Sequence, residues 1–303
     1  MDENYISSAE AAEKWGLSER SVRNYCAQGR LPGAVLQGKA WLIPRDAGKP
    51  DRLIRHSTQS VRDESLLQVL RREKSSRLKG GIYHKIQIDL TYNSNHIEGS
   101  RLTHEQTRYI FETRTIGVTD SAVRIDDIIE TANHFRCIDA VIDGAGAKLS
   151  ESFIKRLHFI LKTGTSDSQK SWFKVGGYKL LENEVGGTET THPGEVPAEM
   201  KKLLSEYNDK KAVSLDDILD FHVRFEAIHP FQDGNGRVGR LIMFKECLRQ
   251  GIVPFIITDE LKMFYYRGLK EWQNERGFLR DTCLTAQDEF KSILDYFKIP
   301  YAG

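Results

Sequence analysis

Helical periodicity recurs over most of the chain and constrains its fold more than any other feature. Apolar residues return every three or four positions in four stretches, at 65–78, 104–114, 121–143 and 151–164. The exception is 170–200, which is Gly-rich and alternating and therefore predicts a β-hairpin projecting from a helical body. We expect a mainly α fold with one hairpin over 64–303.

The first 50 residues form a small unit of a different kind. Ser7 and Glu10 match a capping box at the start of a short helix, and a second helix is predicted to end near Gly29. Apolar alternation around Gly38 then predicts a β-hairpin, which would form a wing. Residues 51–63 are charged and lack an apolar period, so we expect them to be a linker.

Composition limits the choice of partners and compartment. The net charge is +1 with a pI near 7.7, so any nucleic acid or acidic partner must be recognised locally. The four cysteines lie far apart without metal-ligand spacing, which favours a reducing cytoplasm. The polar N-terminus does not resemble a signal peptide, and no stretch has the length of a membrane span. We expect a cytoplasmic protein with no membrane partner.

The run HPFQDGNGRVGR, residues 229–240, lies between two predicted helices. The first begins with Ser214 as N-cap and ends at Pro230, and the second opens at Arg237. Gly234 and Gly236 let the backbone turn its N–H groups toward one point, at which the second helix directs its positive end. The sequence therefore predicts an anion-binding loop.

Charged residues in the same run suit a nucleotide. Arg237 and Arg240 offer guanidinium groups for phosphate oxygens, and Asp233 offers an oxygen ligand for Mg²⁺. His229 stands at the loop entrance, where a neutral imidazole can accept a proton from a hydroxyl that attacks phosphorus. Alone, a histidine before proline is more often a packing residue and GNG more often a turn. Together they predict phosphoryl-type transfer, which needs mainly positioning and charge stabilisation.

The run matches the signature of the Fic family, H-x-F-x-[DE]-G-N-G-R-x-x-R, at every fixed position. The resemblance extends over about 64–303 and implies a complete helical Fic domain. It implies that His229 is the general base, that Phe231 anchors the loop and that Asp233 holds Mg²⁺. The residues that would bind phosphates are Gly234, Asn235, Gly236, Arg237 and Arg240.

In this family the usual donor is ATP, and AMP is moved to a Ser, Thr or Tyr hydroxyl of a protein. The resemblance therefore implies a protein adenylyltransferase with ATP as substrate and Mg²⁺ as cofactor, acting on a protein target that can be the enzyme itself. Related enzymes use other nucleotides or phosphocholine, and a kinase-like member exists.

A second motif resembles the inhibitory motif of the family, [ST]-x-x-x-E-[GN]. It comprises Ser94, Glu98 and Gly99, on a helix expected near 91–99 and preceding the catalytic run. By resemblance Glu98 would pair with Arg240 and so keep ATP in an unproductive pose. An alternative is that Glu98 orients a water molecule that removes AMP from a modified target.

Two further segments resemble parts of the family that contact substrates. The Gly-rich hairpin resembles the flap that aligns a target by strand addition. Its residues nearest ATP would be Val185, Gly186, Gly187 and Thr188. Around the adenosine, the resemblance suggests Tyr265, Tyr266 and Asn274.

Residues 1–50 resemble the winged helix-turn-helix unit of excisionases. The residues that would face DNA are Arg20, Arg23, Asn24 and, on the wing, Lys39. Acidic residues on the same unit leave protein docking or formation of a homodimer as equal alternatives. A regulator that binds DNA and only senses ATP is the third functional hypothesis.

Overall fold

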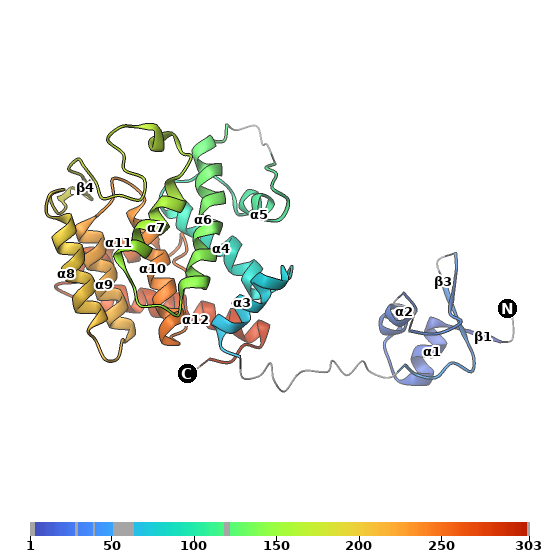
Figure 1. The fold of residues 1–303 in the computed structure, drawn as a ribbon. Helices are drawn as coiled ribbons and strands as arrows, with labels where there is room; N and C mark the ends of the chain where they lie inside the picture. Colours follow the sequence, from blue (N-terminus) through green and yellow to red (C-terminus); the bar gives the residue numbers. More distant parts are fainter. Residues whose placement is uncertain (1–3, 28–29, 39, 51–63, 118–121, 302–303) are drawn as a thin grey trace. The chain divides into compact units, whose positions relative to one another are not determined.

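The computed structural model describes residues 4–27, 30–38, 40–50, 64–117 and 122–301. The chain divides into two compact units, Met1–Thr58 and Gln59–Gly303 (Figure 1). Each unit has its own hydrophobic core. The predicted linker, 51–63, lies outside the described residues.

In the described part of the N-terminal unit, helices pack on a three-stranded antiparallel sheet. The elements are β1 (Tyr5–Ser7), α1 (Ser8–Trp15), α2 (Glu19–Ala27), β2 (Val35–Gln37) and β3 (Ala40–Pro44). The capping box of Ser7 and Glu10 begins α1, and Gly16 ends it in the left-handed conformation. The predicted helices and wing hairpin are confirmed. Strand β1 was not predicted, because its pairing with β3 spans the whole unit.

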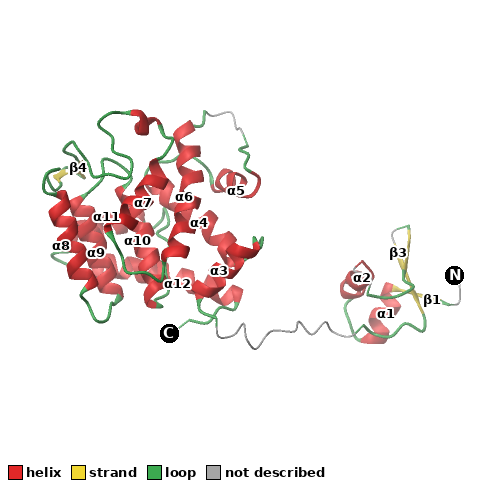
Figure 2. Cartoon of the chain, in the orientation of Figure 1, coloured by secondary structure: helices red, strands yellow, loops and turns green. Residues whose placement is uncertain are grey.

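The C-terminal unit is helical, which confirms the predicted fold class (Figure 2). Its helices are α3 (Leu66–Ser76), α4 (Ile82–Ile97), α5 (His104–Thr113), α6 (Ile125–Gly144), α7 (Glu151–Lys162), the 3₁₀ helix η1 (Ser166–Gln169), α8 (Val196–Asn208), α9 (Leu215–Ile228), α10 (Asn235–Gln250), α11 (Lys262–Glu271) and α12 (Gly277–Phe297). The strands are β4 (Glu184–Val185) and β5 (Thr188–Glu189).

Helix α10 lies at the centre of this unit. Its residues from Val238 to Leu248 are buried, and it contacts α9, α6, α7 and α4 (Figure 1). Each fully buried Leu or Phe contributes about 1.5–3 kcal/mol, so side chains such as Leu241 and Phe244 hold α10 firmly in place. The loop that precedes α10 is therefore attached to a helix that is buried in the core of the unit.

Three element boundaries differ from the sequence-based predictions. Helix α10 begins at Asn235 rather than Arg237, because Gly234 is its N-cap with a φ of 82°. The helix expected near 91–99 is the last part of α4, which starts at Ile82. The predicted hairpin is confirmed only as two strands of two residues each, β4 and β5, and loops make up the remainder of 170–195.

Among the described residues, no helix has both the length and the apolar character needed to cross a membrane.

Candidate active site

The loop between α9 and α10 carries the predicted catalytic run. His229 ends α9 as its C-cap, with a φ of 49°, and its backbone N–H donates to the Phe225 carbonyl over 2.9 Å. A left-handed conformation costs a residue other than glycine on the order of 1–3 kcal/mol, and such strain collects at functional positions. The surrounding fold therefore forces the chain to turn sharply at His229.

The interior of the loop is braced by Phe231 and Asn235. Phe231 is fully buried and stacks on His158 of α7, with ring centroids 4.0 Å apart and planes within 3°. Asn235 receives a bond from the Phe231 N–H and returns one to its carbonyl, both of 2.8 Å. The hydrogen bonds of the Asn235 side chain are thus made within the loop. The group of Asn235 that can face a phosphate is its backbone N–H.

The His229 ring is held with one nitrogen toward the protein. Its Nδ1 lies 3.3 Å from the Glu226 backbone carbonyl. Because a carbonyl can only accept, Nδ1 carries the hydrogen of this bond, and the lone pair of the neutral ring is on Nε2. Burial is the main reason that the pKa of His229 falls to about 4. At neutral pH this imidazole is uncharged and can accept a proton.

A buried charge network supports the other side of the loop. Arg237 pairs with Glu130 of α6 and, over 3.3 Å, with Asp233. Lys162 of α7 is buried and donates to Glu130 over 2.5 Å and to Asp233 over 2.6 Å; Asp167 lies 3.4 Å from the same ammonium. Burial opposes ionisation of Asp233, but Arg237 and Lys162 outweigh it and hold the pKa of this carboxyl below its ordinary range.

Sequence reasoning missed both Glu130 and Lys162. Lys162 follows the apolar face Ile154–Leu157–Leu161 of α7, and a lysine on a buried face was the signal that could have identified it. Glu130 gave no local signal, because its partner Arg237 is 107 positions away.

Asp233 fits a Mg²⁺ ion held jointly with a nucleotide. Its side chain is 47% exposed and borders a cavity of about 660 Å³ that Glu98, Glu130, Lys162 and Arg237 also line. The described residues contain no group of three or more His, Cys, Asp or Glu that would bind a metal unaided. Mg²⁺ commonly takes one or two carboxylates and completes its shell with phosphates and water, as a single ionised Asp233 permits.

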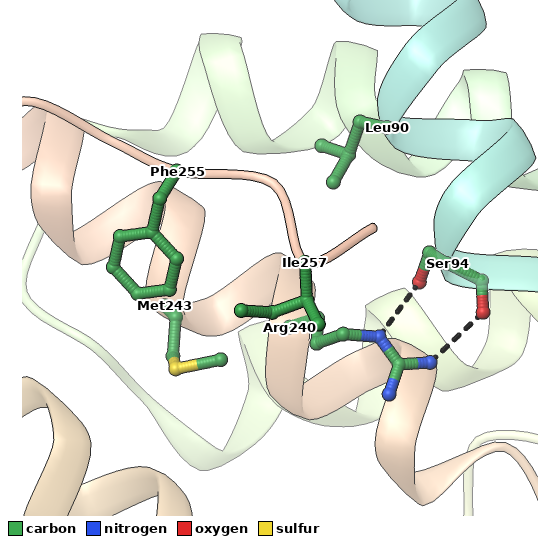
Figure 3. Close-up of a pocket in the computed structure, with 6 residues that line it drawn as sticks. All are labelled: Leu90, Ser94, Arg240, Met243, Phe255 and Ile257. Carbon is green, nitrogen blue, oxygen red and sulfur yellow. Dashed lines mark hydrogen bonds between the residues drawn. The ribbon is translucent and has the colours of Figure 1, made fainter. Parts of the chain in front are cut away.

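Arg240 carries the ion pair with Glu98 that the sequence predicts. Its Nη2 lies 2.7 Å from Glu98 Oε1. The same Nη2 lies 2.9 Å from the Ser94 carbonyl, and Nε donates to Ser94 Oγ over 3.1 Å (Figure 3). Together with Arg240 and Ser94, four apolar residues line a small pocket: Leu90, Met243, Phe255 and Ile257. Burial alone would raise the pKa of Glu98, but Arg240 and Arg237 overcome it and lower this pKa.

The position of Glu98 depends on two glycines. Glu98 is the C-cap of α4, and Gly99 follows with a φ of 90°, which strongly favours glycine. A Cβ at Gly236 would lie 2.3 Å from Glu98 Oε1. The carboxylate therefore lies directly against the first turn of α10, where the anion site is predicted.

The Gly-rich segment is attached to the same loop. Lys179 is buried and its Nζ donates to Asn183 Oδ1 over 2.6 Å, to Thr190 Oγ1 over 2.5 Å and to the Ile228 carbonyl over 3.3 Å. Asn183 in turn donates to the Phe231 carbonyl over 3.1 Å. These bonds fix both ends of the segment that carries β4 and β5 beside His229.

The tip of this segment contains the predicted flap residues. Val185 pairs with Thr188, and both intervening residues, Gly186 and Gly187, have positive φ angles. The side chains of Val185 and Thr188 lie outside what the structure describes.

The predicted adenosine contacts lie in different surroundings. Tyr265 is buried and its hydroxyl lies 2.6 Å from His222 Nε2, so its ring belongs to the core beneath Arg240. Tyr266 is partly exposed, with its hydroxyl 3.5 Å from the Ile97 carbonyl. Asn274 is exposed beyond the end of α11 and donates to Glu271 over 3.3 Å.

The predicted DNA-facing residues lie on α2 and the wing. Arg23 is exposed and pairs with Glu19 over 2.5 Å. Arg20 and Asn24 belong to the same helix, but their side chains, like the whole of Lys39, lie outside what the structure describes.

Comparison with known proteins places two segments in families. Residues 148–247 match the Fic/DOC family, and residues 5–47 match a helix-turn-helix domain. The chain is 28% identical over 209 residues to "Protein adenylyltransferase Fic" of Drosophila grimshawi, covering 66% of this chain and 39% of that protein. The protein of the same name from Aedes aegypti is 29% identical over 182 residues, with 59% and 36% covered. The chain thus spans well under half the length of these relatives.

Solved structures agree on the fold. A Fic-domain signalling protein from Bacteroides thetaiotaomicron is 28% identical, with a TM-score of 0.56 over 77% of this chain and 91% of that one. Fic-1 from C. elegans shares the fold at 19% identity, with a TM-score of 0.58 over 77% and 72%. By the family models, residues 148–247 form a Fic/DOC domain, and a helix-turn-helix domain at residues 5–47 precedes it.

Proposed function

We propose that this chain is an auto-inhibited protein adenylyltransferase that moves AMP from ATP to a Ser, Thr or Tyr hydroxyl of a protein. One observation carries the proposal: a neutral His229 stands at the mouth of a loop whose far end is the N-terminus of α10, with Arg237 beside it. The names of the relatives and the match to the Fic/DOC family support it.

In the proposed reaction, Nε2 of His229 accepts the proton of the target hydroxyl while its oxygen attacks the α-phosphorus of ATP. A new P–O bond forms, the bond to the β-phosphate oxygen breaks, and pyrophosphate leaves. Backbone N–H groups at the start of α10 and the Arg237 guanidinium stabilise the charge on the phosphates. Asp233 would hold Mg²⁺ together with the nucleotide, and the ion would supply further charge neutralisation there.

The inhibition follows from competition for Arg240. A carboxylate and a phosphate are alternative partners of one guanidinium, and Glu98 already occupies Nη2 at 2.7 Å. While this ion pair persists, Arg240 does not bind the terminal phosphate of ATP. The α-phosphorus is then not aligned with the attacking hydroxyl.

Labelling with α-labelled ATP and Mg²⁺ tests the proposal. Wild type should incorporate little label, Glu98→Gly should label a target or itself at least tenfold more, and adding His229→Ala should abolish the gain, since a general base supplies roughly 10²–10⁴-fold. Glu105→Gly, which removes another ion-paired glutamate on α5, should leave the wild-type level unchanged. A folded Glu98→Gly variant that binds ATP yet transfers no label would refute the proposal.

A second activity at the same site is removal of AMP. The Glu98 carboxylate lies against the first turn of α10, within reach of a water molecule that could attack a bound phosphodiester. Modified protein should then release AMP with wild type and fail to do so with Glu98→Gly. Equal release by both variants would exclude Glu98 from this reaction.

The N-terminal unit supports a DNA-binding role, because residues 5–47 match a helix-turn-helix domain. We propose that residues 1–50 place α2 in a major groove. Retention of genomic DNA fragments by the full chain at low salt, lost in Arg23→Ala but kept in Arg45→Ala, would support the role. Retention that does not depend on Arg23 would exclude this residue of α2 from the DNA contact, and no retention at all would point to protein docking instead.

A further inference from the structure

A buried carboxyl group lies directly behind the proposed base. Glu226 lies in the last turn of α9, three positions before His229, which is the C-cap of that helix. Its Oε2 lies 3.9 Å from Nδ1 of His229, and its Oε1 lies 4.0 Å from Nδ1 of His222, one turn earlier. The side chain of Glu226 is 12% exposed, and that of His222 is fully buried. One carboxyl thus stands between two imidazoles.

The atoms through which Glu226 and His222 face each other have no hydrogen-bond partner among the described residues. Among the described residues, Glu226 Oε1 and His222 Nδ1 are buried without a hydrogen bond. Leaving a buried polar atom unpaired costs about 1–3 kcal/mol, so such atoms in a native core call for an explanation. Ordinary packing would place an apolar side chain here.

The neighbouring helix keeps space open for this arrangement. A Cβ at Gly239 of α10 would lie 2.6 Å from Glu226 Oε1 and 2.7 Å from His222 Cε1. Gly239 is not a fixed position of the signature that surrounds it. Glycine in a helix interior costs about 1 kcal/mol relative to alanine, so the helix gives up stability to accommodate the carboxyl group.

Charged residues of the site act on the Glu226 carboxyl group. Burial, followed by the charge of Glu98, raises the pKa of Glu226 to about 8, and Arg240 opposes this rise. His222 is kept neutral by burial, and its Nε2 lies 2.6 Å from the Tyr265 hydroxyl. The other charged groups that face His229 are Lys179, Glu98 and Asp233.

We propose that Glu226 is the positioning residue of His229: its carboxyl group lies behind Nδ1, keeps Nε2 directed at the target hydroxyl, and stabilises the imidazolium that forms on proton transfer. The proton moves from the hydroxyl to Nε2, and the hydrogen on Nδ1 stays in place. The ionised carboxyl is the more effective form, because a negative charge 3.9 Å from Nδ1 increases the proton affinity of the ring.

This inference rests on the proposed transfer reaction, so its test includes a measurement that needs no activity. In the Glu98→Gly background, Glu226→Gln keeps the shape of the side chain and removes its charge. At a pH one unit above the Glu226 pKa, we expect this substitution to lower kcat roughly tenfold. General acid–base catalysis supplies about 10²–10⁴-fold in rate, and the expected loss is a part of that factor. KM for ATP should stay within about twofold, because the nucleotide does not contact Glu226 in this mechanism.

Two further variants separate positioning from folding. Gly239→Ala favours the helix but displaces the carboxyl group, and we expect it to reproduce the loss in kcat. Asp216→Asn removes an exposed carboxylate from the same helix, and we expect no change in kcat or in its pH dependence.

The ring nitrogens of ¹⁵N-labelled histidine report the coupling directly. In the protein that retains Glu98, we expect the His229 Nδ1 resonance to shift as Glu226 ionises near pH 8, and this shift to vanish in Glu226→Gln. Unchanged kcat and unchanged His229 resonances in Glu226→Gln would overturn the inference. If instead the parent Glu98→Gly variant transfers no AMP, the proposed function fails, and the resonances alone still decide whether Glu226 acts on His229.

Discussion

Lys162 shows how a single side chain can prepare a binding site. Its buried ammonium group lies among three carboxylates, of Glu130, Asp167 and Asp233, and together with Arg237 it lowers the pKa of Asp233. Asp233 is the proposed Mg²⁺ ligand. The positive charge of Lys162 therefore holds in place the carboxylate that would also bind the metal.

Replacing Lys162 by Met should therefore destabilise the protein in a way that a divalent cation reverses. Removing one partner of a buried ion pair costs about 3–5 kcal/mol, and we expect a loss of this order in the free energy of unfolding, measured in urea. Millimolar MgCl₂ should recover part of it, because Mg²⁺ replaces the missing charge. Lys155→Met, on the same helix with a more exposed partner, should cost only about 0–1 kcal/mol and show no recovery. A Lys162→Met variant as stable as wild type would contradict this reading.

At the scale of elements, Lys179 is one of the residues that attach the predicted flap segment to the end of α9 and the loop that follows. The three bonds from Lys179 connect Asn183 and Thr190, at the two ends of the β4–β5 turn, with the end of α9. Burial lowers the pKa of Lys179 to about 8, yet its partners are neutral oxygens that suit a charged donor. The flap is therefore fixed at its base while its Gly186–Gly187 tip stays exposed.

Lys179→Met should release this segment without loosening the helices. Hydrogen bonds to a charged group contribute about 1.5–3 kcal/mol, so we expect amide exchange across 180–190 to accelerate at least roughly tenfold. Mass spectrometry should find α10 as protected as before. Lys174→Met, at an exposed position just before the segment, is the matched control. If exchange across 180–190 is the same in both variants, Lys179 does not attach the flap.

Helix α4 illustrates how an element can belong to the fold and to the site at once. Its apolar residues Ile82, Ile86 and Leu90 are part of the main core, while Ser94 and Glu98 at its end contact Arg240. Relief of the proposed inhibition therefore needs a change only in the last turn, because the rest of α4 is held by packing.

At the scale of the whole molecule, buried histidines make the stability of the fold sensitive to acid. Burial lowers the pKa of His134, His158 and His222 to about 3 and that of His229 to about 4, against 6.5 for an exposed histidine. The unfolded chain therefore binds protons that the folded chain does not. This contribution to stability is complete above pH 6.5 and is lost as the pH falls toward the folded values.

We expect the free energy of unfolding to fall between pH 6.5 and pH 4, with up to roughly 1.4 kcal/mol per pH unit for each histidine. Denaturant titrations at several pH values measure this slope. His134→Gln, which removes one buried imidazole of α6, should reduce the slope by the contribution of one histidine, whereas the exposed His192→Gln should leave it unchanged. A slope that is identical in all three proteins would show that buried histidines do not control acid stability.

Features carried by neighbouring residues could be predicted from the sequence. The capping box at Ser7, the N-cap at Ser214 and the turn after His229 depend on interactions within a few positions. The mainly α fold followed from periodicity, and the loop site followed from one run of twelve letters, 229–240. Glu98 was identified only because its motif resembles that of a family.

Only the tertiary structure could decide which distant side chains meet at this loop. Glu130 reaches Arg237 across 107 positions and Lys162 reaches Asp233 across 71, through the packing of α6 and α7 on α10. Glu226 lies close to His229 in the sequence, yet its burial against Gly239 depends on the contact of α9 with α10. Local sequence fixes backbone conformation because its energies act over a few residues, whereas burial and charge pairing depend on which helices pack together.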